Sequence, residues 1–256
     1  MLYSIIKKRG IIMTKQPLIV ITGASSGFGA EMAKLFNAEG FPLLLLGRRI
    51  DKIKELPLNF DNVMIKQVDV TDLASFSMAI TEAEAIYGQT DLLVNNAGVM
   101  LLGNIEKQSP KEWETMLNTN VLGVLNGMSI VLENMKQAHR GTIINMSSIA
   151  GFKAFTNHAA YVASKFGVHG ATETIRQEVA AHNVRISLVA PGAAETELLS
   201  HTTDQEAVTN YNAWKDTMGG ITLDPVHVAQ AVKFIYDMPQ AVNIREIDIA
   251  ATQQDG

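Results

Sequence analysis

Short apolar runs recur along the whole chain, and polar or helical stretches separate them. The runs lie at 17–22, 42–46, 63–68, 91–95, 141–146, 184–190 and 244–249. Continuous apolar runs of this length are typical of strands that are buried on both faces of a parallel sheet. Because the stretches between them have helical spacing, strand and helix alternate. The pattern predicts an α/β fold with a doubly wound, mainly parallel sheet of seven strands.

Two of the expected helices are long, at 109–138 and 156–181. Ser109 and Pro110 suit the N-cap and the first position of the first one. Both helices carry more apolar surface than one sheet face requires, which predicts a homodimer or homotetramer packed through them. The segment 193–220 is polar and irregular or loosely helical. A long connection in a compact domain is usually functional, so we expect a lid over the substrate.

The chain has 256 residues and no linker or repeat, which predicts one domain over 13–256. Met13 begins a clean run into the first strand, so we hypothesise that residues 1–12 are an extension before the natural start. A net charge of −5 without blocks of like charge argues against nucleic acid as a partner. No uninterrupted apolar run has membrane-spanning length, so no membrane association is expected.

The chain contains no cysteine, which excludes thiolate catalysis, disulfides and zinc–thiolate sites. We predict no metal site. Because the chain also shows no export signal, we expect it in the cytoplasm.

A glycine-rich turn, TGASSGFG at 22–29, follows the first strand and opens a helical pattern. Glycines allow a tight turn and a close approach to a pyrophosphate, and the helix N-terminus faces the anion. The order of strand, turn and helix therefore predicts a dinucleotide-binding loop. A glycine-rich turn without a ligand is the alternative.

The second strand ends in Gly47-Arg48-Arg49. In a dinucleotide-binding unit, an acid at this place holds the ribose 2′-hydroxyl, and none is present. Guanidinium groups suit a phosphate instead. This strand end favours NADP(H) over NAD(H), with a solvated arginine pair opening the next helix as the alternative.

Tyr161 and Lys165 are four residues apart, which places them one turn apart on the same face of a helix. A nearby ammonium favours phenolate and lowers a tyrosine pKa that is normally about 10. Such a phenol can donate and accept a proton. Ser148 lies thirteen residues before Tyr161. A chance Tyr-x-x-x-Lys pair on an exposed helix is the alternative.

Further motifs occur in order between these: DVTD at 69–72, NNAG at 95–98, NVLG at 120–123 and PG at 191–192. Together with the glycine turn and the Ser148/Tyr161/Lys165 set, they resemble the short-chain dehydrogenase/reductase family over residues 17–249. The resemblance implies a Rossmann domain with strand order 3-2-1-4-5-6-7. It also implies an NADP(H)-dependent oxidoreductase of class EC 1.1.1.- that transfers hydride between nicotinamide and a small carbonyl or secondary alcohol.

The resemblance assigns four catalytic residues. Tyr161 would exchange a proton with the substrate oxygen, and Ser148 would hydrogen-bond that oxygen. Lys165 would lower the pKa of the tyrosine and hold the nicotinamide ribose. Asn120 would hold a water that links Lys165 to solvent.

The resemblance also assigns a cofactor-binding set. It comprises Gly23, Ser25, Ser26, Gly27, Phe28, Gly29, Arg48, Arg49, Asp69, Val70, Asn96, Ala97, Gly98, Tyr161, Lys165, Pro191, Gly192 and Thr196. In this set the glycine turn lines the pyrophosphate, Arg48 pairs with the 2′-phosphate and Asp69 with the adenine amine. Asn96 lies on the adenosine side and Thr196 touches the carboxamide. The turn departs from the family pattern at Ser26, the residue before Gly27, where many NADP-dependent members carry a basic residue.

The tail 224–254 resembles the subgroup that oxidises 3-hydroxy acids and serine, which implies a carboxylate substrate. The charges disagree, because 193–220 holds five acids against one lysine and no arginine lies between Arg185 and Arg245. Lys153 is the only other cationic candidate. We therefore expect a neutral, partly apolar carbonyl substrate. Its expected contacts, besides Ser148, are Met100, Leu101, Phe155, Trp214 and Met218. For each of these five side chains, packing in the core or in the lid is the alternative.

Three functions stay open. The first is the NADP(H)-dependent oxidoreductase, and the second is a non-redox dehydratase or epimerase with a bound cofactor. The third is a nucleotide-sensing protein without catalysis, which usually has a broken Tyr/Lys pair. In this chain the pair is intact.

Overall fold

The computed structural model of the protein describes residues 16–218 and 221–254. The hypothesis that Met13 is the natural start concerns residues outside these ranges.

Seven strands form one sheet in the order β3-β2-β1-β4-β5-β6-β7, and every pairing is parallel. The strands are β1 (Leu18–Thr22), β2 (Leu43–Gly47), β3 (Val63–Gln67), β4 (Thr90–Asn95), β5 (Thr142–Met146), β6 (Arg185–Pro191) and β7 (Glu246–Ile249). The predicted doubly wound fold and its strand order are confirmed. The order reverses between β1 and β4, where ligands bind in open α/β sheets.

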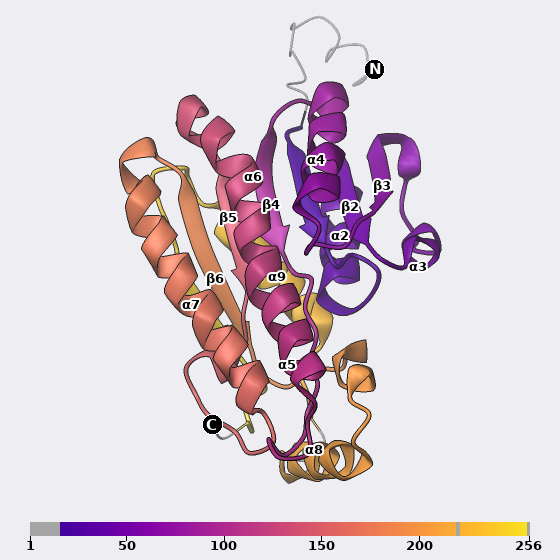
Figure 1. Cartoon of the computed structure of the whole chain (residues 1–256). Coiled ribbons are helices and arrows are strands. Elements are labelled where there is room, and N and C mark those ends of the chain that lie inside the picture. Colours follow the sequence, from indigo (N-terminus) through magenta and orange to yellow (C-terminus); the bar gives the residue numbers. More distant parts are fainter. Residues whose placement is uncertain (1–15, 219–220, 255–256) are drawn as a thin grey trace, which may run out of the picture.

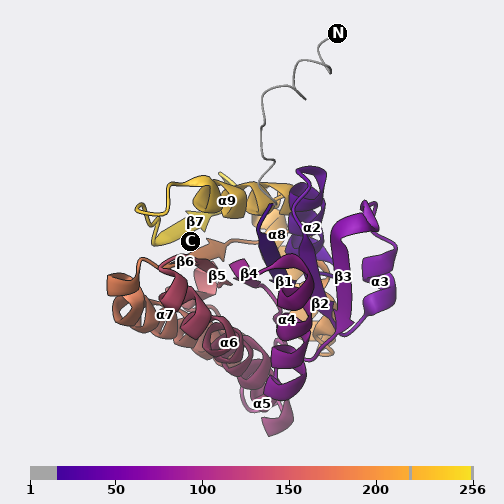
Figure 2. The same ribbon diagram turned by 90° about the horizontal axis from the view of Figure 1, so that it is seen from above.

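Helices cover both faces of this sheet. They are α2 (Gly27–Ala38), α3 (Ile50–Lys54), α4 (Leu73–Tyr87), α5 (Pro110–Leu117), α6 (Gly123–Ala138), α7 (Ala159–Val179), α8 (Gln205–Thr217) and α9 (Pro225–Asp237). Seen from above, α4, α6 and α7 lie on one face and α2 and α9 on the other (Figure 2). Each face has its own apolar core, because the strand residues alternate between the two sides.

The predicted helix start at Ser109 and Pro110 coincides with a cap in the structure. Ser109 and Glu112 form a capping box ahead of α5, with Pro110 at the first position. Asp72 accepts hydrogen bonds from the backbone of Ala74 and Ser75 and so caps α4. Helix α7 begins at Ala159 rather than at 156, because the left-handed backbone of Asn157 (φ 62°) places a turn before it.

The helix expected over 109–138 is continuous, but the turn Asn118–Leu122 between α5 and α6 is π-helical. Such a turn holds one extra residue and recurs at functional sites. By length and composition alone, Pro110–Ala138 could also cross a membrane. In this fold α6 packs on the sheet, and Val124, Met128 and Val131 belong to the core. Sheet packing therefore accounts for the apolar residues on its inner side.

The segment 193–220, expected to be irregular or loosely helical, takes the helical form. It contains a 3₁₀ turn, Glu197–His201, and the helix α8, which lies beyond the carboxyl ends of the strands (Figure 1). Asp204 caps α8 by accepting from the backbone of Glu206 and Ala207. Helix α8 was hard to predict because Ala207 is the one residue within it that is fully buried.

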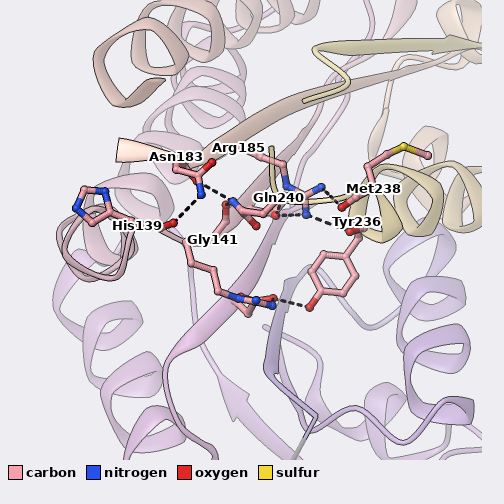
Figure 3. Close-up of polar contacts among 10 residues, drawn as sticks. His139, Gly141, Asn183, Arg185, Tyr236, Met238 and Gln240 are labelled. Carbon is pink, nitrogen blue, oxygen red and sulfur yellow. Dashed lines mark hydrogen bonds and ion pairs between the residues drawn. The ribbon is translucent and has the colours of Figure 1, made fainter. Parts of the chain in front are cut away.

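Polar side chains tie α9 to the amino ends of the strands. Arg185, which is 4% exposed, donates to Thr142 Oγ1 and to the carbonyl oxygens of Ile235, Tyr236 and Met238 (Figure 3). The last carbonyls of the helix thereby gain partners. The tyrosine hydroxyl also donates to Asp91, at 2.6 Å. This end of the sheet is occupied by structural contacts.

Candidate active site

A cavity of about 460 Å³ runs along the carboxyl ends of the strands, between the glycine turn and the lid segment. All members of the predicted cofactor-binding set except Gly29 line it. Ser148, Tyr161 and Lys165 line it too, together with Met100, Phe155 and Trp214 from the predicted substrate contacts. The structure therefore brings together residues from distant parts of the chain.

The glycine turn can exist only without side chains at three positions. Gly23 and Gly27 have positive φ angles of 65° and 53°. A Cβ on Gly23 would lie 2.8 Å from the Cα of Ala97, and one on Gly29 would lie 2.3 Å from the carbonyl oxygen of Gly23. Gly29 thus lets α2 pack against the turn. The bare backbone beside the N-terminus of α2 fits a pyrophosphate.

Asn96 also supports the glycine turn itself. Its Nδ2 donates to the carbonyl oxygens of Thr22, at 2.9 Å, and Gly23, at 3.2 Å. Although the residue lines the cavity, its amide hydrogens hold the shape of the turn. The asparagine therefore positions the glycine turn.

Basic side chains gather where the end of β2 meets the glycine turn. Arg49 donates to the hydroxyls of Ser25, at 3.3 Å, and Ser26, at 3.1 Å. Its other terminal nitrogen lies 2.9 Å from a carboxylate oxygen of Glu197, which also pairs with Lys52 at 2.6 Å. The positive charge at the end of β2 thus extends into α3 and reaches the lid. Lys52 and Glu197 were missing from the predicted set.

The catalytic candidates form a compact group. Tyr161 and Ser148 line the same part of the cavity, where the serine hydroxyl acts to lower the pKa of the tyrosine, and Ser148 Oγ accepts from the backbone of Ala150 at 3.1 Å. Lys165 Nζ lies 5.7 Å from the centroid of the tyrosine ring and donates to the carbonyl of Met146 at 3.0 Å. A hydroxyl pair aimed at one place can bind one substrate oxygen.

Burial sets the protonation of this group. It raises the pKa of Tyr161, and the hydrogen bond from Ser148 opposes this only in part. It lowers the pKa of Lys165 to about 8. The expectation that the ammonium lowers the tyrosine pKa is wrong for the ligand-free protein, because desolvation disfavours both charged forms. The phenol is therefore protonated at neutral pH.

Asn120 lies in the π-helical turn and is 1% exposed. Its Oδ1 accepts from the backbone N–H of Val99 at 2.8 Å, and its Nδ2 donates to the carbonyl of Val99 and to Ser164 Oγ. The second lone pair of Oδ1 stays available. A Cβ on Gly98 would lie 3.3 Å from this oxygen and 3.9 Å from Lys165 Nζ. Both groups therefore face the space above Gly98.

Four aromatic rings form a wall of the cavity beside Tyr161. Their consecutive centroid distances are 5.7 Å for Phe155–His158, 6.0 Å for His158–Tyr211, 5.4 Å for Tyr211–Trp214 and 5.9 Å for Trp214–Phe155. Burial lowers the pKa of the histidine and raises that of Tyr211 to about 12, so both rings are neutral at pH 7. The sequence analysis missed Tyr211 because it did not place a defined helix at α8, and it missed His158, which directly precedes α7.

Three predicted substrate contacts need correction. Lys153 is exposed and does not line the cavity. Met218 is buried but also lies outside the lining, as does Leu101. The lysine follows a short 3₁₀ turn that directs it to solvent, whereas the methionine packs at the end of α8. None of the three can be assigned to substrate from this geometry.

Comparison with known proteins agrees with this arrangement. The short chain dehydrogenase family model matches residues 17–207. An uncharacterized oxidoreductase of Staphylococcus saprophyticus is 34% identical over 244 residues, which cover 94% of this chain and 98% of that protein. The protein therefore belongs to the short-chain dehydrogenase/reductase family and is an oxidoreductase of that family.

Two solved structures show the same architecture. The closed form of serine dehydrogenase complexed with NADP⁺ matches with a TM-score of 0.86 at 29% identity, covering 93% of this chain and 96% of that one. Levodione reductase matches with a TM-score of 0.80 at 26% identity, covering 91% and 95%.

Proposed function

We propose that the protein is an NADP(H)-dependent oxidoreductase that interconverts a small, neutral, partly apolar carbonyl compound and the corresponding alcohol. Tyr161 is its general acid and base. The observation that carries the proposal is the presence of Tyr161 and Ser148 in one cavity with the glycine turn, with Lys165 buried beside the tyrosine ring.

Bound nicotinamide would supply or accept the hydride. In reduction, Ser148 and Tyr161 both donate hydrogen bonds to the carbonyl oxygen, and the tyrosine proton moves to this oxygen as negative charge develops there. In oxidation, the tyrosine oxygen takes the proton of the alcohol. Lys165 stabilises the tyrosinate by its charge, and its lowered pKa of about 8 suits it to pass on a proton near neutral pH. Asn120 holds a water between this amine and solvent.

The preference for NADP(H) rests on the basic side chains Arg48, Arg49 and Lys52, and on the absence of an acid at the end of β2. The serine dehydrogenase of similar structure is complexed with NADP⁺. Guanidinium groups bind phosphate through paired hydrogen bonds, which supports recognition of the 2′-phosphate.

The aromatic wall supports a neutral substrate, as does the pairing of Lys215, a cation of the cavity lining, with Glu195 at 3.0 Å. The segment 193–220 would act as the lid of a single domain over 13–256. A second candidate is oxidation of serine or a 3-hydroxy acid, which the likeness to serine dehydrogenase favours. A carboxylate substrate would have to draw Lys215 away from Glu195.

The test is the loss of NADPH absorbance with a panel of carbonyl compounds, both neutral and carboxylate-bearing. Tyr161→Phe removes the proton donor, so turnover should fall by about 10²- to 10⁴-fold while NADPH binding persists. Tyr236→Phe, which removes a hydroxyl at the opposite end of the sheet, is the control and should keep its turnover. Undiminished turnover in Tyr161→Phe would rule out this proton donor, and turnover without NADPH loss would indicate a non-redox enzyme.

A further inference from the structure

The carboxylate of Glu197 forms ion pairs with two basic side chains, Arg49 and Lys52, beside the glycine turn. Glu197 begins the 3₁₀ turn of the lid segment, whereas Arg49 follows β2 and Lys52 belongs to α3. One carboxylate oxygen lies 2.9 Å from Arg49 Nη1 and the other 2.6 Å from Lys52 Nζ. Hydrogen bonds from Lys52 and Arg49 hold the pKa of Glu197 at about 2, so the carboxylate is charged at physiological pH. The anion bound by Arg49 and Lys52 is therefore the carboxylate of Glu197, a residue of the lid segment.

The same bases adjoin the place where an adenosine phosphate would bind. The second terminal nitrogen of Arg49 donates to the hydroxyls of Ser25 and Ser26 in the glycine turn. Arg48, Arg49 and Glu197 line one cavity with that turn. A phosphate monoester carries a charge of about −1.5 to −2 at pH 7 and would repel a carboxylate on the same guanidinium. The two anions therefore exclude each other.

We propose that Glu197 competes with the 2′-phosphate of NADP(H) for Arg49 and Lys52, and so determines how strongly the protein prefers NADP(H) over NAD(H). This inference rests on the proposed cofactor. Binding of the phosphate releases Glu197 and the lid turn that carries it. Binding of NAD(H) leaves both ion pairs in place. Cofactor choice and the position of the lid turn are thereby linked.

The ion pairs are suited to exchange. The three side chains are 40–45% exposed, and pairs this exposed contribute little to stability. A dianion that forms charge-assisted bonds to the same bases can displace the carboxylate. Loss of the competitor should therefore strengthen phosphate binding only modestly, by about two- to tenfold.

Calorimetry with 2′,5′-ADP and 5′-AMP tests this competition without any substrate or turnover. The full-length Glu197→Gln variant should bind 2′,5′-ADP about two- to tenfold more tightly than the wild type and should bind 5′-AMP equally well. Glu206→Gln is the matched control, because it removes one lid charge that pairs with Lys107 at 2.9 Å outside the cavity lining. It should change neither affinity.

Hydrogen–deuterium exchange supplies a second readout. In the wild type, 2′,5′-ADP should speed exchange of the backbone amides of 197–203, whereas 5′-AMP should not. If Glu197→Gln binds 2′,5′-ADP no more tightly than the wild type, this inference is overturned but the NADP(H) assignment stands. The same holds if its affinity for 5′-AMP rises as much as its affinity for 2′,5′-ADP. A wild type that binds both nucleotides equally would overturn the NADP(H) assignment and this inference together.

Discussion

Lys165 is 6% exposed, and its amine donates to the carbonyl of Met146 at 3.0 Å. An ammonium in such a place loses the hydration that its charge needs, so burial lowers its pKa to about 8. In the unfolded chain the same amine has an ordinary pKa of about 10.4. Between these two values the unfolded state binds more protons, so this residue makes stability rise with pH.

Lys165→Met removes that penalty. Below pH 8 the lysine is charged in both states and its desolvation cost is fully present, so the variant should be more stable at pH 7 by on the order of 3 kcal/mol. The difference should shrink as pH rises through this window, because the folded lysine then becomes neutral. Urea unfolding of the ligand-free proteins at pH 7 and pH 10 measures both values.

Lys111→Met, at an exposed position, is the control. It should change stability by less than about 0.5 kcal/mol at both pH values. A stability gain of Lys165→Met that is the same at pH 7 and pH 10 would show that the desolvated charge is not its cause.

Side-chain spacing was enough to place Tyr161 and Lys165 on one helix face, whereas Ser148, two residues after β5, joined them through the family resemblance. It was not enough to predict the direction of the tyrosine pKa. That direction depends on how deeply the cavity buries both groups, which is a property of the folded chain.

Helix α2 and the glycine turn form the element that an added methyl group would disturb most clearly. In Gly29→Ala the new Cβ would lie 2.3 Å from the carbonyl of Gly23 and 2.7 Å from Asn96 Nδ2, so the turn must open. We expect a loss of stability of about 1–3 kcal/mol and a weaker affinity for NADPH. Thermal unfolding and titration of NADPH fluorescence measure the two effects.

Gly170→Ala is the matched substitution in α7, since nothing lies within 4 Å of its added Cβ. There alanine should stabilise the protein by about 0.5–1 kcal/mol and leave NADPH binding unchanged. A Gly29→Ala protein that binds NADPH as well as the wild type would mean that the turn does not hold the cofactor.

Helices and strands could be predicted where their burial requires a recognisable pattern of apolar residues. The strands β1, β2 and β4 are buried at every residue and appear as continuous apolar runs. Helix α8 leaves little mark because most of its residues face solvent. The π-helical turn leaves none, because it depends on contacts of Asn120 with the distant Val99 backbone.

At the scale of the whole molecule, one flank carries more apolar surface than a monomer needs. Leu117, Leu122 and Leu125 on the α5–α6 segment and Phe166 on α7 are 38–47% exposed. The two segments run side by side on the same face of the sheet (Figure 1). A Cβ on Gly167 would lie 3.4 Å from Val121, so they also touch. Contiguous exposed apolar patches mark interaction sites.

We therefore expect a homodimer or homotetramer packed through these helices, with a mass measurable by light scattering. Leu125→Glu combined with Phe166→Glu places like charges in the apolar patch and should reduce the mass to that of a smaller assembly, because a charge buried without a partner is costly. Phe60→Lys, at an exposed apolar residue near the β3 edge, should leave the mass unchanged. Since the cavity is lined by residues of one chain, the dissociated variant should still bind NADPH. A wild type that is monomeric at micromolar concentration would contradict this prediction and leave the apolar flank to another partner.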